Sequence, residues 1–338
     1  MSGPILGIDI GGTKLAVGLA AADGMLLAEA RQASGAEEGP DPVIGRILEL
    51  ARGVVEEAGI GLEAVERIGI GCGGPLDPWR GVIHNALNMP GWIDIPIVAR
   101  IELELGRPAF LDNDANAAAL GEHRFGAGRG VDNLVYLTIS TGVGGGVILN
   151  GRLYQGENGN AAELGHISVD AAGRACHCGS VGCIETYCSG TSIAARTREA
   201  LTADDEPSVL RSAPAEGITA QAVAAAAREG DALAAAIWDE SMHLLGAGIV
   251  SIIHAFNPRL VILGGGVTRS GDQLFSPVRR VVDERTMPWL REAVEIVPAA
   301  LGEMTGILGA VAVALDGPAA RGDSAAHASA RTEETTHA

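Results

Sequence analysis

The sequence predicts an α/β protein in which helices cover β-sheets in layers. Three observations support this fold class: short apolar runs typical of buried strands, longer runs with apolar residues at helical spacing, and the alternation of the two along the chain. With 338 residues, 47% of them hydrophobic, the chain is long enough to form two domains with sizeable cores.

The N-terminal segment predicts a hairpin with a glycine-rich turn. Ile5–Ile10 has the composition of a buried strand, and Gly11–Lys14 turns the chain into a second strand at Leu15–Ala20. Asp23 and Gly24 then form a second hairpin signal.

A loop, a helix and further strands are expected next. Small and acidic residues predict a loop over Gln32–Pro42. Apolar spacing predicts a helix over Val43–Ala58 that Gly59 ends. The segments that follow are predicted as a strand at Ile68–Gly71, a turn at Gly73–Pro75, a helix at Ile97–Leu105, a strand at Pro108–Leu111 and a helix at Ala117–His123.

The pattern of strand, glycine turn and strand then occurs a second time. Asn133–Ser140 predicts a strand, Gly142–Gly146 a turn and Val147–Leu149 a returning strand, followed by a hairpin signal at Asn150 and Gly151. Two such hairpins on two domains could clamp one polyphosphate between them.

Helices dominate the prediction for the C-terminal half. A long helical region is expected over Ala220–Phe256, broken near Gly230, and a strand over Leu260–Leu263 is followed by Gly264–Gly266. Residues 317–338 contain no large apolar side chain and are predicted to be a disordered tail.

Charge and composition exclude several classes of function. The net charge of −18 works against a nucleic-acid backbone as partner, and 3% aromatic residues supply few stacking platforms. No secretory leader opens the sequence, and the uncharged stretch Ser241–Pro258 contains two histidines, which argues against a membrane span. We therefore expect a soluble cytoplasmic protein.

The glycine turns favour phosphate binding, because backbone N–H groups without a neighbouring Cβ can approach an anion closely. The sequence contains no P-loop string, and Val147 stands where a dinucleotide fingerprint needs its third glycine. Lys14 is the one lysine of the chain and lies in the first turn, close to Asp9. Ordinary hairpin geometry is the alternative explanation for either turn taken alone.

Three cysteines and a histidine predict a zinc site. His166, Cys176, Cys178 and Cys183 supply the ligand types of a tetrahedral Cys₃His centre within 18 residues. Four protein ligands leave no open position, so the zinc would be structural. A disulfide or inert thiols are the alternatives, and His177 is a possible replacement for His166 as ligand.

A polar run, Leu111–Asn116, follows a predicted strand and leads into a helix. A carboxylate here could accept a proton from a substrate hydroxyl, and Asn113 could bind a neighbouring hydroxyl. Helix capping explains one such residue but does not require four. Spacing alone does not choose between Asp112 and Asp114 as the base.

Two acids lie beside the predicted zinc ligands. Glu163 precedes His166 by three residues, and Glu185 follows Cys183 by two. If zinc orders this loop, both carboxylates are held near the metal and could bind the hydroxyls of a polyol. Solvated surface acids are the alternative.

These motifs together resemble the ROK family (repressors, uncharacterised open reading frames and kinases), from about Ile5 to Leu315. The resemblance implies an actin-like, ribonuclease-H-like fold in two lobes with ATP in the cleft. It implies a small lobe of residues 1–117 and 306–316 and a large lobe of residues 118–305. The strings that carry it are Asp9–Lys14, Leu111–Asn116, Ser140–Gly146, Glu163–His166, the cysteine box with Glu185, and Leu263–Val267.

The resemblance also implies roles for individual residues. Asp114 would be the catalytic base, and Asp9 would hold Mg²⁺ through water. His166 would bind zinc through one ring nitrogen and sugar through the other. The sugar would be held by Gly74, Asn88, Asn113, Asp114, Glu163, His166 and Glu185; the nucleotide would be held by Asp9, Gly11, Gly12, Thr13, Lys14, Thr141, Gly142, Gly144, Gly264, Gly265 and Gly266.

The activity that this resemblance implies is phosphoryl transfer from Mg·ATP to a hexose. Glucose is the leading acceptor, because Glu163–Val169 looks like the corresponding segment of family glucokinases. N-acetylglucosamine, N-acetylmannosamine, mannose and fructose are alternatives, and a noncatalytic sugar-responsive regulator is a different class. Family analogy implies a homodimer or homotetramer. One departure from the family pattern is Gly73 before Gly74, where many members have proline.

Overall fold

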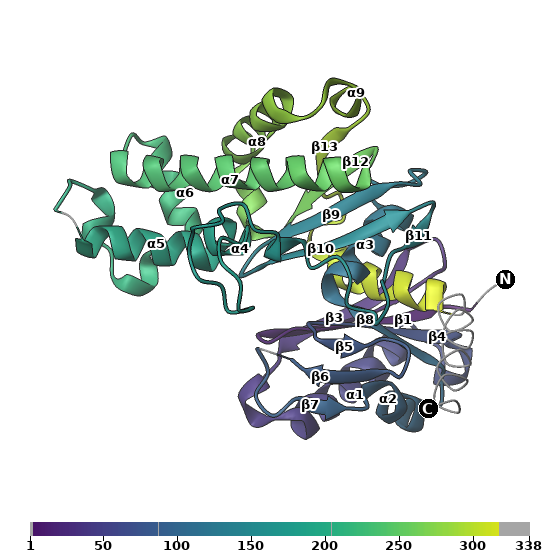
Figure 1. Ribbon diagram of the computed structural model, residues 1–338. Helices are drawn as coiled ribbons and strands as arrows, with labels where there is room; N and C mark the ends of the chain where they lie inside the picture. The colour runs from purple at the N-terminus through teal and green to yellow at the C-terminus, as the bar shows by residue number, and fades with distance from the viewer. Residues whose placement is uncertain (1–2, 87, 204, 318–338) are drawn as a thin grey trace, which may run out of the picture. The chain divides into compact units, whose positions relative to one another are not determined.

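The computed structural model describes residues 3–86, 88–203 and 205–317, which form two compact units (Figure 1). Unit 1 comprises residues 3–130, 153–161 and 300–317 of the described chain, and unit 2 comprises residues 131–152 and 162–299. The division predicted from the sequence, after residues 117 and 305, therefore differs from the observed one. The difference arises because α3 (Asp114–Phe125) packs as a whole on unit 1, where its Gly121 meets Gly309.

Unit 1 is built on a mixed five-stranded sheet with the order β3-β2-β1-β4-β8. The β1–β2–β3 part is antiparallel, whereas β4 and β8 run parallel to β1. The strands are β1 Ile5–Ile10, β2 Lys14–Ala20, β3 Leu26–Ala33, β4 Arg67–Cys72 and β8 Ala109–Asn113; a second sheet holds β5 Leu76–Asp77, β6 Val82–Asn85 and β7 Ile93–Ile95.

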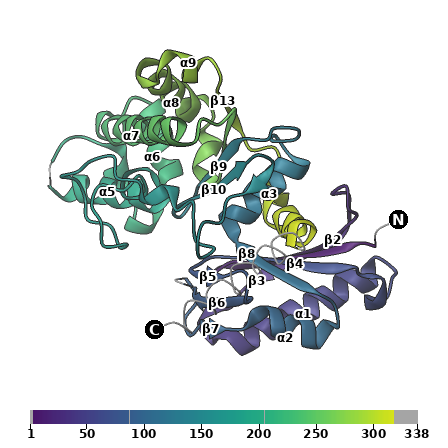
Figure 2. The same ribbon diagram turned by 45° about the vertical axis from the view of Figure 1, so that its right-hand side comes forward.

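Helices cover both faces of the unit 1 sheet (Figure 2). One face packs on α1 (Pro40–Glu57) and α2 (Ile97–Leu105). The other face carries α3 and a helix over residues 305–317. The apolar positions predicted for α1 are the ones that the structure buries: Val43, Ile44, Ile47, Leu48, Ala51, Val54 and Val55.

The 305–317 helix packs on a row of glycines in the unit 1 sheet. Gly18, Gly7 and Gly69 pair with one another across β2, β1 and β4. A Cβ atom on Gly69 would lie 1.7 Å from the carbonyl oxygen of Ala310, and one on Gly7 would lie 2.5 Å from that of Ile307. The helix backbone therefore approaches the sheet more closely than side chains would allow.

Unit 2 repeats the strand order of unit 1, as β11-β10-β9-β12-β13. An antiparallel hairpin is again followed by two strands parallel to its first strand. The strands are β9 Leu134–Ile139, β10 Val143–Leu149, β11 Arg152–Leu153, β12 Leu260–Gly264 and β13 Glu295–Pro298; the helices are α4 Glu185–Cys188, α5 Gly190–Ala203, α6 Ala220–Arg228, α7 Ala232–Phe256, α8 Asp272–Arg285 and α9 Pro288–Arg291.

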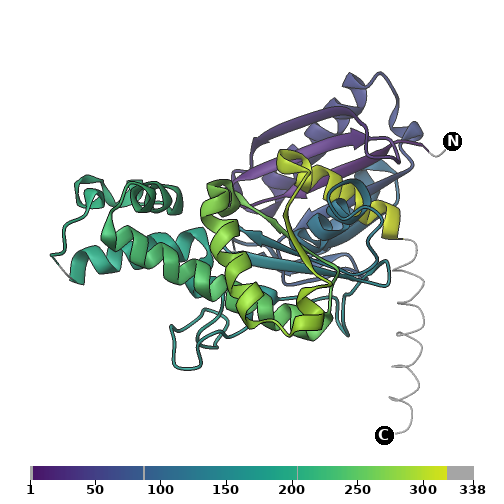
Figure 3. The ribbon, with the colours of Figure 1, turned by 90° about the horizontal axis from the view of Figure 1, so that it is seen from above.

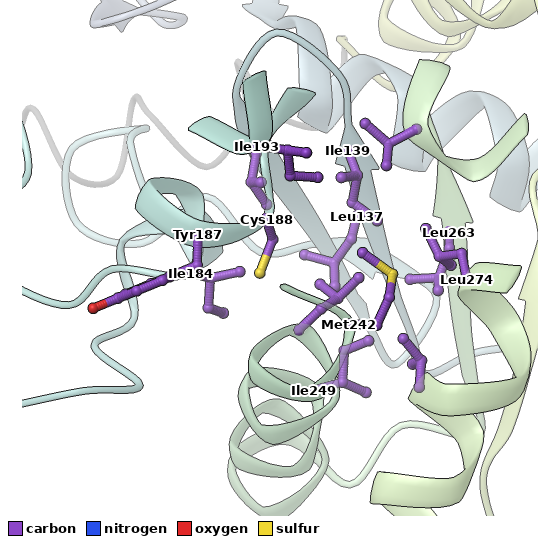
Figure 4. Close-up of a cluster of buried hydrophobic side chains, with 14 of the residues drawn as sticks. Leu137, Ile139, Ile184, Tyr187, Cys188, Ile193, Met242, Ile249, Leu263 and Leu274 are labelled. Carbon is purple, nitrogen blue, oxygen red and sulfur yellow. The ribbon is translucent and has the colours of Figure 1, made fainter. Parts of the chain in front are cut away.

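The core of unit 2 lies between its sheet and its helices. Leu137 and Leu263 from the sheet meet Met242 and Ile249 from α7 and Leu274 from α8 (Figure 4). The helices α7 and α8 pack along each other (Figure 3). By length and composition alone α7 could cross a membrane, but 61% of its most apolar window is buried within the protein, as expected for a core helix.

Several sequence predictions need correction at element boundaries. The loop predicted over Gln32–Pro42 is shorter, because β3 extends to Ala33 and α1 begins at Pro40. The second glycine turn ends at Gly142, and Val143–Gly146 belong to β10. The helix predicted to start at Ala117 starts at Asp114.

Other boundaries agree with their predictions. The predicted break near Gly230 separates α6 from α7. Of the predicted tail, Gly317 is helical, and residues 318–338 lie outside the described chain.

Candidate active site

Ser34 holds the first glycine turn of unit 1 in place through two hydrogen bonds. The Ser34 hydroxyl donates to the carbonyl oxygen of Gly12 at 2.6 Å, and its N–H donates to that of Thr13 at 3.1 Å. Gly11 N–H closes the turn onto the carbonyl oxygen of Lys14 at 3.0 Å. Thr13 and Lys14 are exposed, so an ammonium and a hydroxyl are available to an anion at this turn.

Asp9 lies at the base of this turn. A Cβ atom on Gly306 would lie 2.1 Å from its Oδ2 atom, so only glycine fits beside the carboxyl. The pKa of Asp9 is raised to about 7, mainly by burial and less by the nearby Asp114, against the lowering effects of Lys14 and Arg31. A cation bound beside Asp9 would favour its ionised form, which makes this carboxyl a suitable partner for a divalent ion.

The junction of β8 and α3 gives two acids opposite environments. The carboxyl of Asp112 is 4% exposed and accepts hydrogen bonds from Asn113 N–H at 2.7 Å, Asn116 Nδ2 at 2.9 Å and Gln155 Nε2 at 2.7 Å. The side chain of Asp114 is open to solvent and accepts one hydrogen bond, from Ala115 N–H at 2.8 Å. Of the two, Asp114 is the carboxylate that a substrate hydroxyl can reach.

The pKa of Asp114 is raised. Solvent reaches one side of the carboxyl, but the protein around its other sides withdraws it from bulk water, and this desolvation raises the pKa. The N–H groups of Ala115 and of Asp114 itself lower the pKa by less. Asn113 is the N-cap of α3, and its Oδ1 atom accepts from Ala115 N–H at 2.9 Å, so its Nδ2 amino group can serve a ligand.

Two of the predicted sugar residues of unit 1, Gly74 and Asn113, are neighbours, and a third, Asn88, contacts the first glycine turn. A Cβ atom on Gly74 would lie 3.4 Å from Asn113 Nδ2, whereas Asn88 packs on the glycine turn, with its carbonyl oxygen 2.8 Å from a Cβ atom on Gly12. Asn160, which sequence reasoning missed, accepts from Leu76 N–H at 3.2 Å and faces Gly74.

The second glycine turn, in unit 2, consists of Ser140, Thr141 and Gly142. Ser140 N–H donates to the carbonyl oxygen of Gly142 at 2.9 Å, and Gly190 N–H donates to that of Ser140 at 2.7 Å. Ser140 and Thr141 are exposed. The predicted nucleotide residue Gly144 lies beyond the turn, in β10, paired with Thr138.

A cavity of about 680 Å³ opens beside this turn and is formed entirely by unit 2. The first turns of α5 and α6 line it, and Ser189 and Thr219 cap these helices by accepting from Ser192 N–H and Ala222 N–H. Helix N-termini favour anions. The lining residues are Ser140, Thr141, Gly190, Thr191, Ala194, Arg198, Ile218, Thr219, Ala220, Gln221, Ala224, Ala225, Arg228, Trp238, Gly266, Val267, Arg269 and Ser270.

Sequence reasoning found only part of this cavity. Thr141 and Gly266 were predicted and line it. Gly264 is buried and Gly265 half-buried, neither lines the cavity, and a Cβ atom on them would meet the Tyr136 hydroxyl and the Ile139 carbonyl oxygen, respectively, at 2.4 Å. The lining from α5 and α6 was missed, although Ser and Thr before a helix are recognisable N-cap signals.

The four predicted zinc ligands converge. The ligand atoms of His166, Cys176, Cys178 and Cys183 lie within 4.8 Å of one another, and the cysteines form no disulfide. Cys178 Sγ and Cys183 Sγ are 3.7 Å apart, and Cys176 Sγ is 3.6 Å from His166 Nδ1. Tetrahedral bonds of about 2.3 Å to sulfur and 2.0 Å to nitrogen give a sulfur–sulfur edge of about 3.8 Å and a sulfur–nitrogen edge of about 3.5 Å, so the cluster fits zinc.

Glu163, His177 and Glu185 surround His166 and the cysteines, and His177 Nδ1 lies 3.9 Å from Cys176 Sγ. The Nε2 atom of His166 is 3.9 Å from Glu163 Oε2, so the two ring nitrogens face different partners. Glu185 accepts from Val143 N–H at 2.8 Å through Oε2, and its Oε1 atom lies 3.4 Å from His177 Nδ1. Glu185 thus links the zinc-ligand loop to the second glycine turn.

Proteins of a known family resemble this chain over most of its length. The ROK family model matches residues 5–317. A glucokinase of Thermotoga maritima is 39% identical over 310 residues, covering 91% of this chain and 96% of that protein. The xylose repressor of Bacillus subtilis is 31% identical over 251 residues, covering 74% of this chain and 61% of the repressor. A crystal structure of a ROK family glucokinase from Streptomyces griseus, in complex with glucose and AMPPNP, has a TM-score of 0.77 at 34% identity, covering 93% of this chain and all of that one.

Proposed function

The chain belongs to the ROK family, and from this premise we propose that it is an ATP-dependent glucokinase that phosphorylates the 6-hydroxyl of glucose. The observation that carries the proposal is the solvent-open carboxylate of Asp114 beside the Asn113 amide. The Thermotoga glucokinase and the Streptomyces griseus structure with glucose and AMPPNP support glucose as acceptor and ATP as donor.

Each unit supplies its own share of the binding groups. From unit 1, Asp114 and Asn113 contact the reacting hydroxyl and its neighbour, and Gly74 borders them. From unit 2, Glu163, His166 and Glu185 bind further sugar hydroxyls; His166 does so through Nε2. The cavity beside the second glycine turn takes the adenosine, and Thr141 and the turn at Gly11–Lys14 bind phosphates.

The reaction is an in-line transfer of the γ-phosphoryl group. A bond forms between the sugar oxygen and phosphorus, the bond from phosphorus to the ADP oxygen breaks, and the hydroxyl proton passes to Asp114. Because such transition states are loose, orientation of the hydroxyl matters more than strong basicity. Mg²⁺ bound beside Asp9 would neutralise charge on the phosphates.

We propose further that zinc is bound by His166, Cys176, Cys178 and Cys183 and that its role is structural. Four protein ligands complete its tetrahedral coordination, so it offers no position to substrate. Binding through His166 Nδ1 fixes the ring so that Nε2 faces the sugar. Metal analysis of the purified protein should find about one zinc per chain.

The test of the main proposal is a coupled assay with ATP and five sugars: glucose, mannose, fructose, N-acetylglucosamine and N-acetylmannosamine. We expect glucose to have the highest kcat/KM. A higher value for one of the other sugars would keep the kinase and change its substrate. Absence of ATP turnover with all five, in protein that binds glucose, would favour a sugar-responsive regulator of the kind that the matching xylose repressor represents.

We place the enzyme in the cytoplasm, where ATP is available and thiols stay reduced. Family analogy favours a homodimer or homotetramer. Light scattering on the purified protein distinguishes these assemblies from a monomer.

A further inference from the structure

Asp112 is a buried acid beside the reacting groups for which the proposed mechanism has no use. It is the fourth residue of β8 and directly precedes Asn113 and Asp114. Its carboxyl is 4% exposed, and each hydrogen bond that it accepts comes from a different part of unit 1. A carboxyl buried in this way is costly unless its surroundings satisfy it, so its presence calls for a structural reason.

The three donors tie three segments together. Asn113 N–H belongs to the end of β8, Asn116 Nδ2 to the first turn of α3, and Gln155 Nε2 to residues 153–161. The first two donors reach Oδ1, whereas Gln155 reaches Oδ2 at 2.7 Å.

Residues 153–161 lead from this contact to the proposed sugar site. Five residues after Gln155, Asn160 Oδ1 accepts from Leu76 N–H at 3.2 Å and lies 4.0 Å from a Cβ atom on Gly74. A shift of Gln155 would therefore move the segment that borders Gly74 and Asn113.

We propose that Asp112 is a positioning residue that fixes the β8–α3 junction and docks residues 153–161 against it, so that Asn113 and Asp114 meet the sugar hydroxyl at the correct angle. The proposal rests on the proposed function for its kinetic consequences. Asp112 itself does not contact the substrate, because its two oxygens are engaged by protein donors.

The chemistry of the donors explains why the residue is an acid. A carboxylate offers only acceptors, and here it faces three donors. An asparagine at the same position could still accept from Asn113 and Asn116 through its carbonyl oxygen. Its amino group would then face the amino group of Gln155, and the contact would persist only with the Gln155 amide rotated so that its Oε1 atom accepts.

This arrangement permits a test by exchanging the two groups. In the double variant Asp112→Asn with Gln155→Glu, the new amide donates to the new carboxylate, and the hydrogen bond returns with reversed polarity at unchanged total charge. Gln155→Glu alone breaks the contact by opposing two carboxylates, whereas Asp112→Asn alone keeps it through rotation of the Gln155 amide. Asp239→Asn, an exposed position on α7, is the matched control.

For Gln155→Glu we expect kcat with glucose to fall by about 10–100-fold, the range that misorientation of reacting groups produces. The KM for ATP should stay within about 2-fold, because the nucleotide cavity belongs to unit 2. Gln155→Glu should be impaired most at high pH and recover as the pH falls, because two facing carboxylates can share a proton. The double variant should recover kcat to within about 3-fold of the wild type.

Hydrogen exchange of residues 153–161 provides a readout that does not depend on activity. Exchange should accelerate in Gln155→Glu and return to the wild-type rate in the double variant. If the double variant restores neither protection nor kcat, the proposal is overturned, and it is also overturned if protection returns without kcat. If the wild type itself turns over no sugar, the proposed function fails, and restored protection then still supports the docking role of Asp112.

Discussion

Asp114 and Asp112 differ in how many of their acceptor positions the protein already occupies. The carboxyl of Asp112 is saturated by three donors, whereas Asp114 accepts from Ala115 N–H and keeps a side open to solvent. The raised pKa of Asp114 also suits a group that takes up a proton late in the transfer.

Replacing Asp114 by asparagine should therefore remove turnover and preserve binding. We expect kcat to fall by about 10²–10⁴-fold, the usual contribution of a positioned general base, because the amide cannot accept the hydroxyl proton. Glucose affinity measured by calorimetry should change by less than about 3-fold, since the amide still offers an oxygen and fits the same space. Wild-type kcat in this variant would remove Asp114 from the mechanism.

Asp9 predicts a pH dependence of stability in the absence of Mg²⁺ and nucleotide. Its pKa is about 7 in the folded protein against an ordinary value of 3.8, so between these values the folded state holds a proton that the unfolded state has lost. The free energy of unfolding therefore decreases as the pH rises through this window. Asp9→Asn removes the penalty and should raise Tm at pH 8 by roughly 2–5 °C.

Two comparisons check this assignment of the effect to Asp9. At pH 4, where the wild-type carboxyl is still protonated when folded, the variant and the wild type should melt at nearly the same temperature. An equal difference in Tm at both pH values would show that ionisation of Asp9 is not the cause. Differential scanning fluorimetry over the pH range provides the measurement.

At the scale of single residues, the sequence could supply candidates but not their environments. It placed both Asp112 and Asp114 in the polar run, yet burial and the contact with Gln155, 43 positions away, separate their roles. The convergence of the four proposed zinc ligands was predictable, because their types and spacing restrict the choice strongly. The packing of Gly264 and Gly265 was not predictable, since it depends on contacts with Tyr136 and Ile139 in another strand.

Elements in this fold are held together by close backbone contact as well as by side chains. The 305–317 helix lies on the glycine row of the unit 1 sheet, and the same helix brings Gly306 against Asp9. A change in how the helix sits would thus reach the proposed cation site.

Gly69→Ala should be strongly destabilising for this reason. Its Cβ atom would lie 1.7 Å from the carbonyl oxygen of Ala310, and a backbone atom cannot rotate away. We expect a loss of about 3 kcal/mol or more in the free energy of unfolding, measured by urea denaturation.

Gly45→Ala, in the middle of α1, is the matched control. No atom lies within 4 Å of the new Cβ, so the change should stabilise the protein by about 0.5–1 kcal/mol through helix propensity. If Gly69→Ala were as stable as Gly45→Ala, the close approach of helix and sheet would be wrong.

Elements with a clear apolar period were predictable, and those without one were not. The buried face of α1 follows from its sequence residue by residue. By contrast, α5 buries Arg196 and Thr197 together with Ile193 and Ala194, so its core face is not an apolar stripe. The helix α8 does keep the period, since it buries Leu274, Phe275, Val278, Val281 and Val282, but Pro277 inside it is a residue that argues against a helix in the sequence.

The whole molecule consists of two units with the same strand order and separate hydrophobic cores. The repeated strand, glycine turn and strand in the sequence predicted the start of this duplication. The remaining strands and the exact unit boundaries could not be predicted, because the chain changes unit at residues 130, 152, 161 and 299 without a marked change in composition.

Because the two units have separate hydrophobic cores, we expect loss of zinc to destabilise unit 2 and leave unit 1 unchanged. The proposed ligands lie on a loop whose Ile184, Tyr187 and Cys188 belong to the core of unit 2, and none of them contributes to the core of unit 1. After removal of zinc by a chelator, hydrogen exchange should therefore accelerate in residues 163–190 and in β10, which Glu185 contacts through Val143.

The glycine row and β1, β4 and β8 of unit 1 should keep their exchange rates under the same treatment. Glucose affinity should fall by at least about 10-fold, the effect expected when the shell that orients binding groups is lost, and should return when zinc is added back. Cys72→Ser, at a buried cysteine of unit 1 outside the cluster, serves as a control that leaves the zinc content unchanged. Equal acceleration of exchange in both units would mean that the protein unfolds as one cooperative body and that zinc stabilises the whole of it. Unchanged exchange in fully zinc-free protein would show that the loop needs no metal to stay ordered.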